Sequence, residues 1–229
     1  MKLQPLGDVA VVATLGEQID PASLKLVLSF VEAVAQAKAK GILDIVPAYA
    51  SVTVFYDSAQ LGDAPGGAYE SVCRLLEACA QKARSTPAPQ GARAVEIPVC
   101  YGEDYGPDIE FVAEHCRIGI DEVISLHSGG DYLVHAIGFT PGFPYLGGLP
   151  EALCTPRKDT PRARVPAGSV AIGSAQTGVY PMASPGGWQI IGRTPMQLFR
   201  PHLDPASLLK PGDRVRFKPI SPGDFELWR

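Results

Sequence analysis

The sequence contains few charged residues, and this narrows the partners that the protein can have. Charged side chains make up 19% of the 229 residues, and the formal net charge at pH 7 is −4. Binding to nucleic acid or to an anionic membrane is favoured by a strongly basic surface. We therefore expect neither kind of partner. A hydrophobic content of 46% is instead typical of an ordinary globular protein.

Long hydrophobic runs and paired cysteines are also missing. No apolar run approaches the roughly 20 residues of a membrane-spanning helix. The N-terminus, MKLQPLGDVAVVATLGEQ, becomes polar and acidic too early for a secretory signal, so we expect a cytoplasmic protein. The cysteines are odd in number, have no CxxC spacing and are interpreted as buried small hydrophobic residues: Cys73, Cys79, Cys100, Cys116 and Cys154. The sequence also has no histidine or carboxylate spacing typical of a metal site, so no metal is expected.

What the sequence does contain is a segment crowded with glycine and proline, from Gly138 to Pro195. Disordered linkers of such composition lack large apolar side chains, whereas this segment carries aromatic and aliphatic residues throughout. It can therefore bury surface, and its glycines and prolines then fix tight backbone shapes. Folded regions that are rich in loops are where binding and catalysis tend to occur.

The first 88 residues predict an α+β domain. The expected elements are a strand (9–15), a helix beginning at Asp20-Pro21 and ended by Gly41, two strands joined by a proline-containing loop (42–46 and 51–56), and a helix (68–83). This order suits a small ferredoxin-like sandwich. A linker, RSTPAPQGA, follows at 84–92, and it predicts a boundary near Pro89 between domains 1–88 and 89–229.

Residues 89–229 predict a barrel or sandwich, because short strands separated by glycine and proline turns dominate. The expected elements are a strand (94–100), two short helices (108–116 and 121–128), and further strands (132–137, 169–172, 179–182, 189–192, 197–199 and 215–219).

A basic cluster contrasts with the acidic chain and consists of Arg157, Lys158, Arg162 and Arg164. Arginine binds carboxylate or phosphate through two parallel hydrogen bonds, and the neighbouring prolines predict a stiff loop. The alternative is a solvated loop that pairs with the protein's own carboxylates.

Polar side chains follow around a run of glycines, among them Ser169, Gln176, Thr177 and Tyr180. A glycine-rich turn can present backbone N–H groups to an anion. The segment matches neither a phosphate-binding loop nor a GxSxG elbow, and AGSVAIG alone is more typical of a turn that enters a strand. His127 ends an apolar helical stretch and is a candidate for proton transfer; the plainer alternative is a favourable position at a helix C-terminus.

Aromatic residues are spaced through the same segment. Phe139, Phe143 and Tyr145 alternate with turn residues, and Trp188 follows two glycines. They are predicted to line an apolar pocket or a subunit interface, with packing in the core as the alternative for Trp188.

The long motifs GFTPGFPYLGGLP, TPRKDTPRARVPAGSVAIGSAQTGVYPMASPGGWQIIGRTP and PGDRVRFKPI resemble those of the 5-oxoprolinase B-subunit family, also called KipI or allophanate hydrolase subunit 1. The resemblance spans the whole chain, including GDVAVVATLGEQID and PAYASVTVFYD. It implies an N-terminal ferredoxin-like domain followed by a cyclophilin-like β-barrel of the carboxyltransferase C/D type.

The resemblance also implies an activity and partners. With a KipA-like C subunit and an A subunit, the complex resembles the ATP-dependent 5-oxoprolinase, which opens 5-oxo-L-proline to L-glutamate and hydrolyses ATP to ADP and phosphate. Since the lactam is a poor electrophile, phosphorylation of its oxygen would allow ring opening. We expect Arg157 and Arg162 to hold anionic groups, and Ser169, Gln176, Thr177 and Tyr180 to orient the amide. The expected catalytic set is His127, Arg162 and Gln176.

Two other functions stay open at this point. One is a KipI-like inhibitor of a sensor histidine kinase, and the other is a component of a urea- or amide-carboxylating system. The fold does not separate them, because all three use the same architecture. The basic, hydroxyl-rich loop favours the enzyme component, since a pure protein interface needs anchors more than convergent polar groups.

Overall fold

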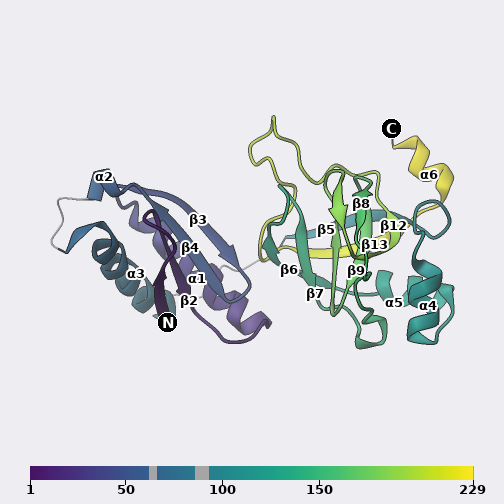
Figure 1. The fold of residues 1–229 in the computed structure, drawn as a ribbon, viewed down its shortest axis with the longest axis horizontal. Coiled ribbons are helices and arrows are strands. Elements are labelled where there is room, and N and C mark those ends of the chain that lie inside the picture. Colours follow the sequence, from purple (N-terminus) through teal and green to yellow (C-terminus); the bar gives the residue numbers. More distant parts are fainter. Residues whose placement is uncertain (62–65, 86–92, 229) are drawn as a thin grey trace. The chain divides into compact units, whose positions relative to one another are not determined.

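The computed structural model describes residues 1–61, 66–85 and 93–228, and the chain divides into two compact units, Met1–Ala92 and Arg93–Arg229 (Figure 1). The boundary that the sequence predicts near Pro89 lies outside the described residues. We describe each unit by itself.

The first unit is an antiparallel sheet with two long helices (Figure 1, purple to blue). Its strands lie in the order β1 (Lys2–Pro5), β2 (Ala10–Thr14), β4 (Ser51–Tyr56) and β3 (Ile42–Ala48). Because β4 is antiparallel to both neighbours, β2 and β3 run in the same direction on either side of it. Helix α1 (Pro21–Ala37) connects β2 to β3, and α2 (Ser58–Leu61) and α3 (Gly67–Ser85) follow β4. Alternate residues of β4 are buried, as expected for a strand with one covered face.

The start of the first helix is as predicted, whereas its end and the following loop are not. Helix α1 begins at the expected cap, where the side chain of Asp20 accepts a hydrogen bond of 2.7 Å from the Ser23 N–H. Its end was predicted wrongly: the left-handed cap is Lys38, with φ 45°, and its N–H bonds to the Ala35 carbonyl, ahead of Gly41. The proline-containing loop between β3 and β4 is also wrong, because Pro47 belongs to β3.

The second unit is a closed barrel of seven strands, which confirms the barrel that the short strands predict. The order is β6 (Tyr132–Ile137), β13 (Arg214–Pro219), β5 (Ala94–Tyr101), β12 (Gln189–Arg193), β9 (Ser169–Gly173), β10 (Gln176–Val179) and β7 (Pro144–Gly147). Pairing of β7 with β6 closes it. Helices α4 (Ile109–Cys116) and α5 (Ile120–Ser128) add Val112 and Val123 to the barrel core.

Short elements complete the second unit: η1 (Glu151–Leu153), β8 (Arg162–Val165), β11 (Ser184–Gly186) and α6 (Pro222–Leu227). Strands β8 and β11 pair with each other in a separate two-stranded sheet. The sequence did not predict β7, β8 or β11, because glycine and proline dilute the strand signal there. The strands expected at 179–182 and 197–199 are wrong: β10 ends at Val179, and Phe199 makes an isolated bridge to Ser207.

Candidate functional site

Aromatic side chains from separate parts of the glycine-rich segment gather around Phe143. Ring centroids lie 5.0 to 5.6 Å from that of Phe143 for its four neighbours, which are Phe139, Tyr145, Tyr180 and Trp188. Along β9, Val170 and Ile172 belong to the barrel core, whereas Ala171 between them packs in the aromatic cluster. Since successive strand residues face opposite sides, the cluster lies on the outer side of the barrel wall.

Two glycines make this close packing possible. A Cβ atom on Gly173 would lie 2.4 Å from the indole ring of Trp188, and one on Gly186 would lie 2.4 Å from the hydroxyl of Tyr180. Neither contact is tolerable, because the rings lie directly against the backbone at these positions. The glycines therefore set the shape of the site.

Exposure changes across the aromatic cluster. Trp188, Tyr180 and Phe143 are buried and Tyr145 is half-buried, while Phe139 is 62% exposed. Phe139 also has φ 66°, a left-handed conformation that bulky residues rarely adopt. An exposed ring held in a strained backbone marks this end of the cluster as a surface of functional interest.

The second feature of the site is a buried carboxylate, Asp108, which is 5% exposed. It accepts two hydrogen bonds from Arg162, of 2.7 and 2.8 Å, and one of 3.1 Å from Lys158 Nζ. A fourth, of 2.7 Å, comes from the backbone N–H of Ile190. Burial alone would raise the pKa of Asp108, but these bonds together outweigh it and lower the pKa.

The pairing with Asp108 divides the basic cluster into two kinds of residue. Arg162 and Lys158 are bound to the protein's own carboxylate, as the plainer interpretation of the basic loop expected. Arg157 and Arg164 are exposed. The guanidinium carbon of Arg157 lies 5.6 Å from the ring centroid of Trp188, within the range of a cation–π contact. Arg157 is therefore the cation that borders the aromatic cluster.

His127 lies inside the barrel and is 0% exposed. Its ring stacks on Phe217, with centroids 4.6 Å apart. Nδ1 lies 2.8 Å from the hydroxyl of Tyr101, and Nε2 lies 2.9 Å from Oγ1 of Thr177. Since the Thr177 hydroxyl donates its proton to the Ala171 carbonyl, at 3.0 Å, it accepts from His127. This chain of bonds assigns the neutral tautomer with hydrogen on Nε2.

Burial lowers the pKa of His127 to about 3, so the ring is neutral at physiological pH. The structure thus does not bring His127 together with the arginines, and no exposed face of its ring is available to a substrate. Thr177 shares this interior position, at 0% exposure. The expected proton-transfer role of His127 does not fit this placement, because a proton donor must reach the reacting atom.

The remaining predicted residues lie close to the barrel wall. Ser169 is buried in β9, and Gln176 is half-buried at the start of β10. Tyr180 follows β10, and burial, the largest influence, raises the pKa of its hydroxyl. Asp108 was missed among the candidate residues, because its position in the sequence is that of the first residue of a helix. Its side chain makes no capping bond to α4 and turns to Arg162 instead.

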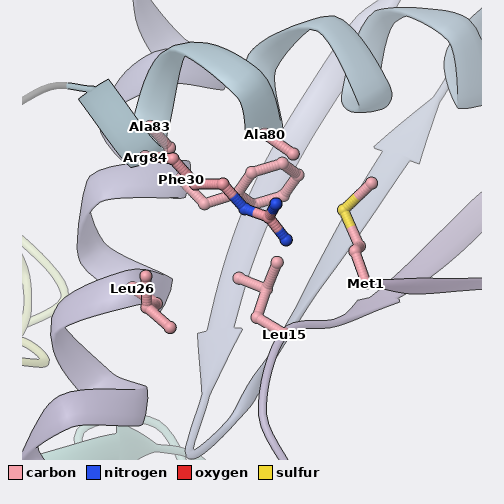
Figure 2. A pocket seen from close by; sticks show the side chains of 7 residues that line it. All are labelled: Met1, Leu15, Leu26, Phe30, Ala80, Ala83 and Arg84. Carbon is pink, nitrogen blue, oxygen red and sulfur yellow. The ribbon is translucent and has the colours of Figure 1, made fainter.

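A hollow of about 50 Å³ lies in the first unit between α1, α3 and the start of the chain. Its lining is apolar apart from Arg84, as Figure 2 shows, and consists of Met1, Leu15, Leu26, Phe30, Ala80, Ala83 and Arg84. None of the predicted site residues belongs to it.

Over the described ranges, we find no group of three or more His, Cys, Asp or Glu side chains that could hold a metal ion. In the same ranges, every helix is too short or too polar to cross a membrane.

Comparison with known proteins defines the class to which this architecture belongs. Residues 1–209 match the family described as carboxyltransferase domain, subdomain C and D. The B subunit of the 5-oxoprolinase of Bacillus subtilis (strain 168) is 41% identical over 233 residues, which cover 100% of this chain and 96% of that protein. The chain belongs to the 5-oxoprolinase B-subunit family, which confirms the resemblance carried by the sequence motifs.

Solved structures show the same fold in longer chains. TTHA0988 superposes with a TM-score of 0.78 at 38% identity, over 93% of this chain and 40% of that one. Urea carboxylase of Kluyveromyces lactis superposes with a TM-score of 0.76 over 98% of this chain and 22% of that one. Because the identity to urea carboxylase is 18%, this similarity supports the fold alone.

Proposed function

We propose that this protein is the B subunit of an ATP-dependent 5-oxoprolinase, a hydrolase that converts 5-oxo-L-proline, ATP and water to L-glutamate, ADP and phosphate. The observation that carries the proposal is the 41% identity to the B subunit of a 5-oxoprolinase over almost the full length of both chains. ATP acts as a co-substrate of the complex. Because ATP is an intracellular compound, the proposal places the complex in the cytoplasm.

The surface around Phe139 supports a site that is completed by other chains. Phe139 and Arg157 are exposed beside a preformed, buried aromatic cluster. Aromatic and arginine side chains of this kind anchor protein interfaces when a partner covers them. The proposed partners are the KipA-like C subunit and the A subunit of the same enzyme.

Within this proposal, Arg157 binds the substrate carboxylate or the developing phosphate charge. The residue is exposed and its guanidinium borders Trp188, and arginine binds both groups through paired hydrogen bonds. Tyr145, Trp188 and Phe139 form the apolar wall. Arg162 supports the site through Asp108, and Gln176, which is half-buried, remains a proposed contact for the amide. Tyr180 is buried and supports the aromatic cluster from within. His127, Thr177 and Ser169 are buried and maintain the barrel.

The finer fold assignments belong to the same proposal. In the first unit, β4 lies between β2 and β3, which run in one direction and are joined by α1. This topology supports the split βαβ arrangement expected of a ferredoxin-like domain, with β1 beside β2 as the remaining strand. The closed barrel of the second unit supports the cyclophilin-like assignment.

The exposed Phe139 also favours a second candidate function, inhibition of a sensor histidine kinase in the manner of KipI. An exposed aromatic anchor serves a regulatory interface as well as it serves an interface within an enzyme complex. The test is the affinity of a Phe139→Ala variant for a purified sensor kinase. If the affinity is unchanged, Phe139 gives this second function no support.

The decisive experiment for the enzyme proposal is co-expression of the chain with candidate A and C subunits, followed by an assay of ATP-dependent glutamate formation from 5-oxoproline. The matched variants are Arg157→Ala and Arg164→Ala, because both residues are exposed arginines of one segment. We expect Arg157→Ala to lower kcat/KM by at least roughly tenfold, and Arg164→Ala to change it little. Failure to co-purify with any KipA-like partner, together with no ATP-dependent turnover, would overturn the proposal.

A further inference from the structure

The loop that bears Arg157 is held to the barrel on both sides of that residue. On one side, Nε2 of Gln189 donates a hydrogen bond of 2.9 Å to the Pro156 carbonyl. On the other side, the backbone N–H of Lys158 donates one of 2.7 Å to the Gly187 carbonyl. These two bonds fix the backbone immediately before and after Arg157.

Asp108 adds a third attachment, made through side chains. It binds Lys158 and Arg162 at the same time, so both ends of the segment from Lys158 to Arg162 are tied to one carboxylate. The backbone of Asp108 is itself fixed, because its N–H donates to the Ile190 carbonyl at 2.9 Å. Ile190 is a residue of β12, so the attachment leads directly into the barrel wall.

The charges in this arrangement explain which cation remains available. Arg162, Lys158 and the N–H of Ile190 form a set of donors that would suit a bound anion, and the protein fills it with its own carboxylate. A substrate carboxylate would have to displace Asp108 from a bidentate, half-buried pair to use Arg162. Arg157 faces no such competition from Asp108 and is an exposed residue.

We infer that Asp108 is a positioning residue, which clamps the 156–162 loop so that Arg157 is held over Trp188 in the orientation that receives the substrate's anionic group. The inference rests on the proposed function for the part that concerns the substrate. The clamp itself is a property of this chain alone. The two parts can therefore be tested separately.

Trypsin provides the test of the clamp, because the 157–164 segment contains four cleavable basic residues, none followed by proline: Arg157, Lys158, Arg162 and Arg164. The isosteric variant Asp108→Asn removes the charge that holds Arg162 and Lys158. We expect cleavage within 157–164, mapped by mass spectrometry, to be at least roughly tenfold faster in this variant than in the native chain. Equal cleavage rates in the two proteins overturn the clamp.

A matched control separates release of the loop from general destabilisation. Asp213 is also a buried carboxylate, 1% exposed, and it accepts hydrogen bonds from Arg93 and from the Lys210 N–H. Asp213→Asn is expected to leave cleavage within 157–164 unchanged. If Asp108→Asn does not fold, Lys158→Met removes one of the two cations from the same carboxylate and is subjected to the same digestion, with cleavage compared after Arg157, Arg162 and Arg164 because the substitution removes the site at 158. Accelerated cleavage is again the expected result, and an unchanged rate counts against the clamp.

Kinetics of the reconstituted complex test the positioning role. We expect Asp108→Asn to raise KM for 5-oxoproline by roughly tenfold or more, with a smaller change in kcat. In an Arg157→Ala background, the same substitution should change KM by less than about twofold, because the residue through which Asp108 acts is already gone. Equal effects in both backgrounds overturn positioning through Arg157, even where the loop is released. A native complex without turnover contradicts the proposed function instead, and the digestion still decides the clamp.

Discussion

The barrel wall formed by β9, β10 and β12 has a polar network on each of its two sides, and the networks differ in charge. Inside, the neutral ring of His127 joins Tyr101 to Thr177. Outside, the carboxylate of Asp108 binds Arg162 and Lys158. The difference follows from solvent access: His127 is 0% exposed, whereas the side chains of Arg162 and Lys158 are 28% and 31% exposed. Ionised groups are tolerated where water still reaches one partner, and the closed core accepts a titratable group in its neutral form.

The largest expected effect is the response of the inner network to acid. The unfolded chain protonates His127 below a pH of about 6.5, whereas the folded chain does so below about 3. The unfolded state therefore binds more protons between these values, and the free energy of unfolding falls as pH falls, by roughly 1 kcal/mol per pH unit. Asp108 acts in a lower window: its pKa is depressed, so its contribution persists above a pH of about 4 and is lost only as pH falls further.

Urea unfolding between pH 7 and pH 4 measures this response, with His127→Gln as the matched variant. Glutamine keeps a donor and an acceptor but does not titrate, so the variant should show a flatter dependence of the unfolding free energy on pH, whatever its absolute stability. The comparison of the two networks fails if both proteins show the same slope in this range.

A smaller effect is expected from the last link of the inner network. Thr177→Val removes the hydroxyl that accepts from His127 Nε2 and leaves that N–H unpaired in the core. The expected loss is about 1–2 kcal/mol in the free energy of unfolding at pH 7. Thr177→Ser keeps the hydroxyl and controls for the methyl group, so it should lose clearly less. Equal losses would mean that the methyl group contributes as much to stability as the hydrogen bond does.

The sequence predicted which kinds of residue form the site better than it predicted how those residues contact one another. Glycine, proline and aromatic residues in one segment correctly indicated a folded region, and the short strands predicted the barrel. The pairing of Asp108 with Arg162 was beyond such reasoning, because 54 residues separate them and the contact depends on how β12 and β8 lie in the fold. The side of the wall on which Thr177 lies was equally hidden, since the glycine in β10 leaves no clear alternation of polar and apolar residues.

Two predictions in the first unit were wrong, and both rested on local residue preferences. Lys38 ends α1 in a left-handed conformation that glycine adopts more easily, so composition pointed to Gly41 instead. Pro47 was expected in a loop, yet it belongs to β3. In both cases residue preferences, which amount to about 1 kcal/mol, did not decide the local conformation.

The smallest predicted effect concerns the outer side, where the backbone of Phe139 is strained while its ring is exposed. Asparagine tolerates the left-handed region better than phenylalanine, and this relief offsets the loss of the ring contact with Phe143. Phe139→Asn should therefore change the free energy of unfolding of the isolated chain by about 1 kcal/mol or less, as thermal unfolding would show. The same variant should co-purify less well with its partner, because the exposed ring is lost. The control is Phe139→Leu, which retains an apolar side chain in the strained backbone.

A strained and exposed aromatic residue is unfavourable in the free chain, so its presence is explained if the ring is buried in the complex. Unchanged co-purification of Phe139→Asn would leave the strain without this explanation and would mean that the interface lies elsewhere on the chain.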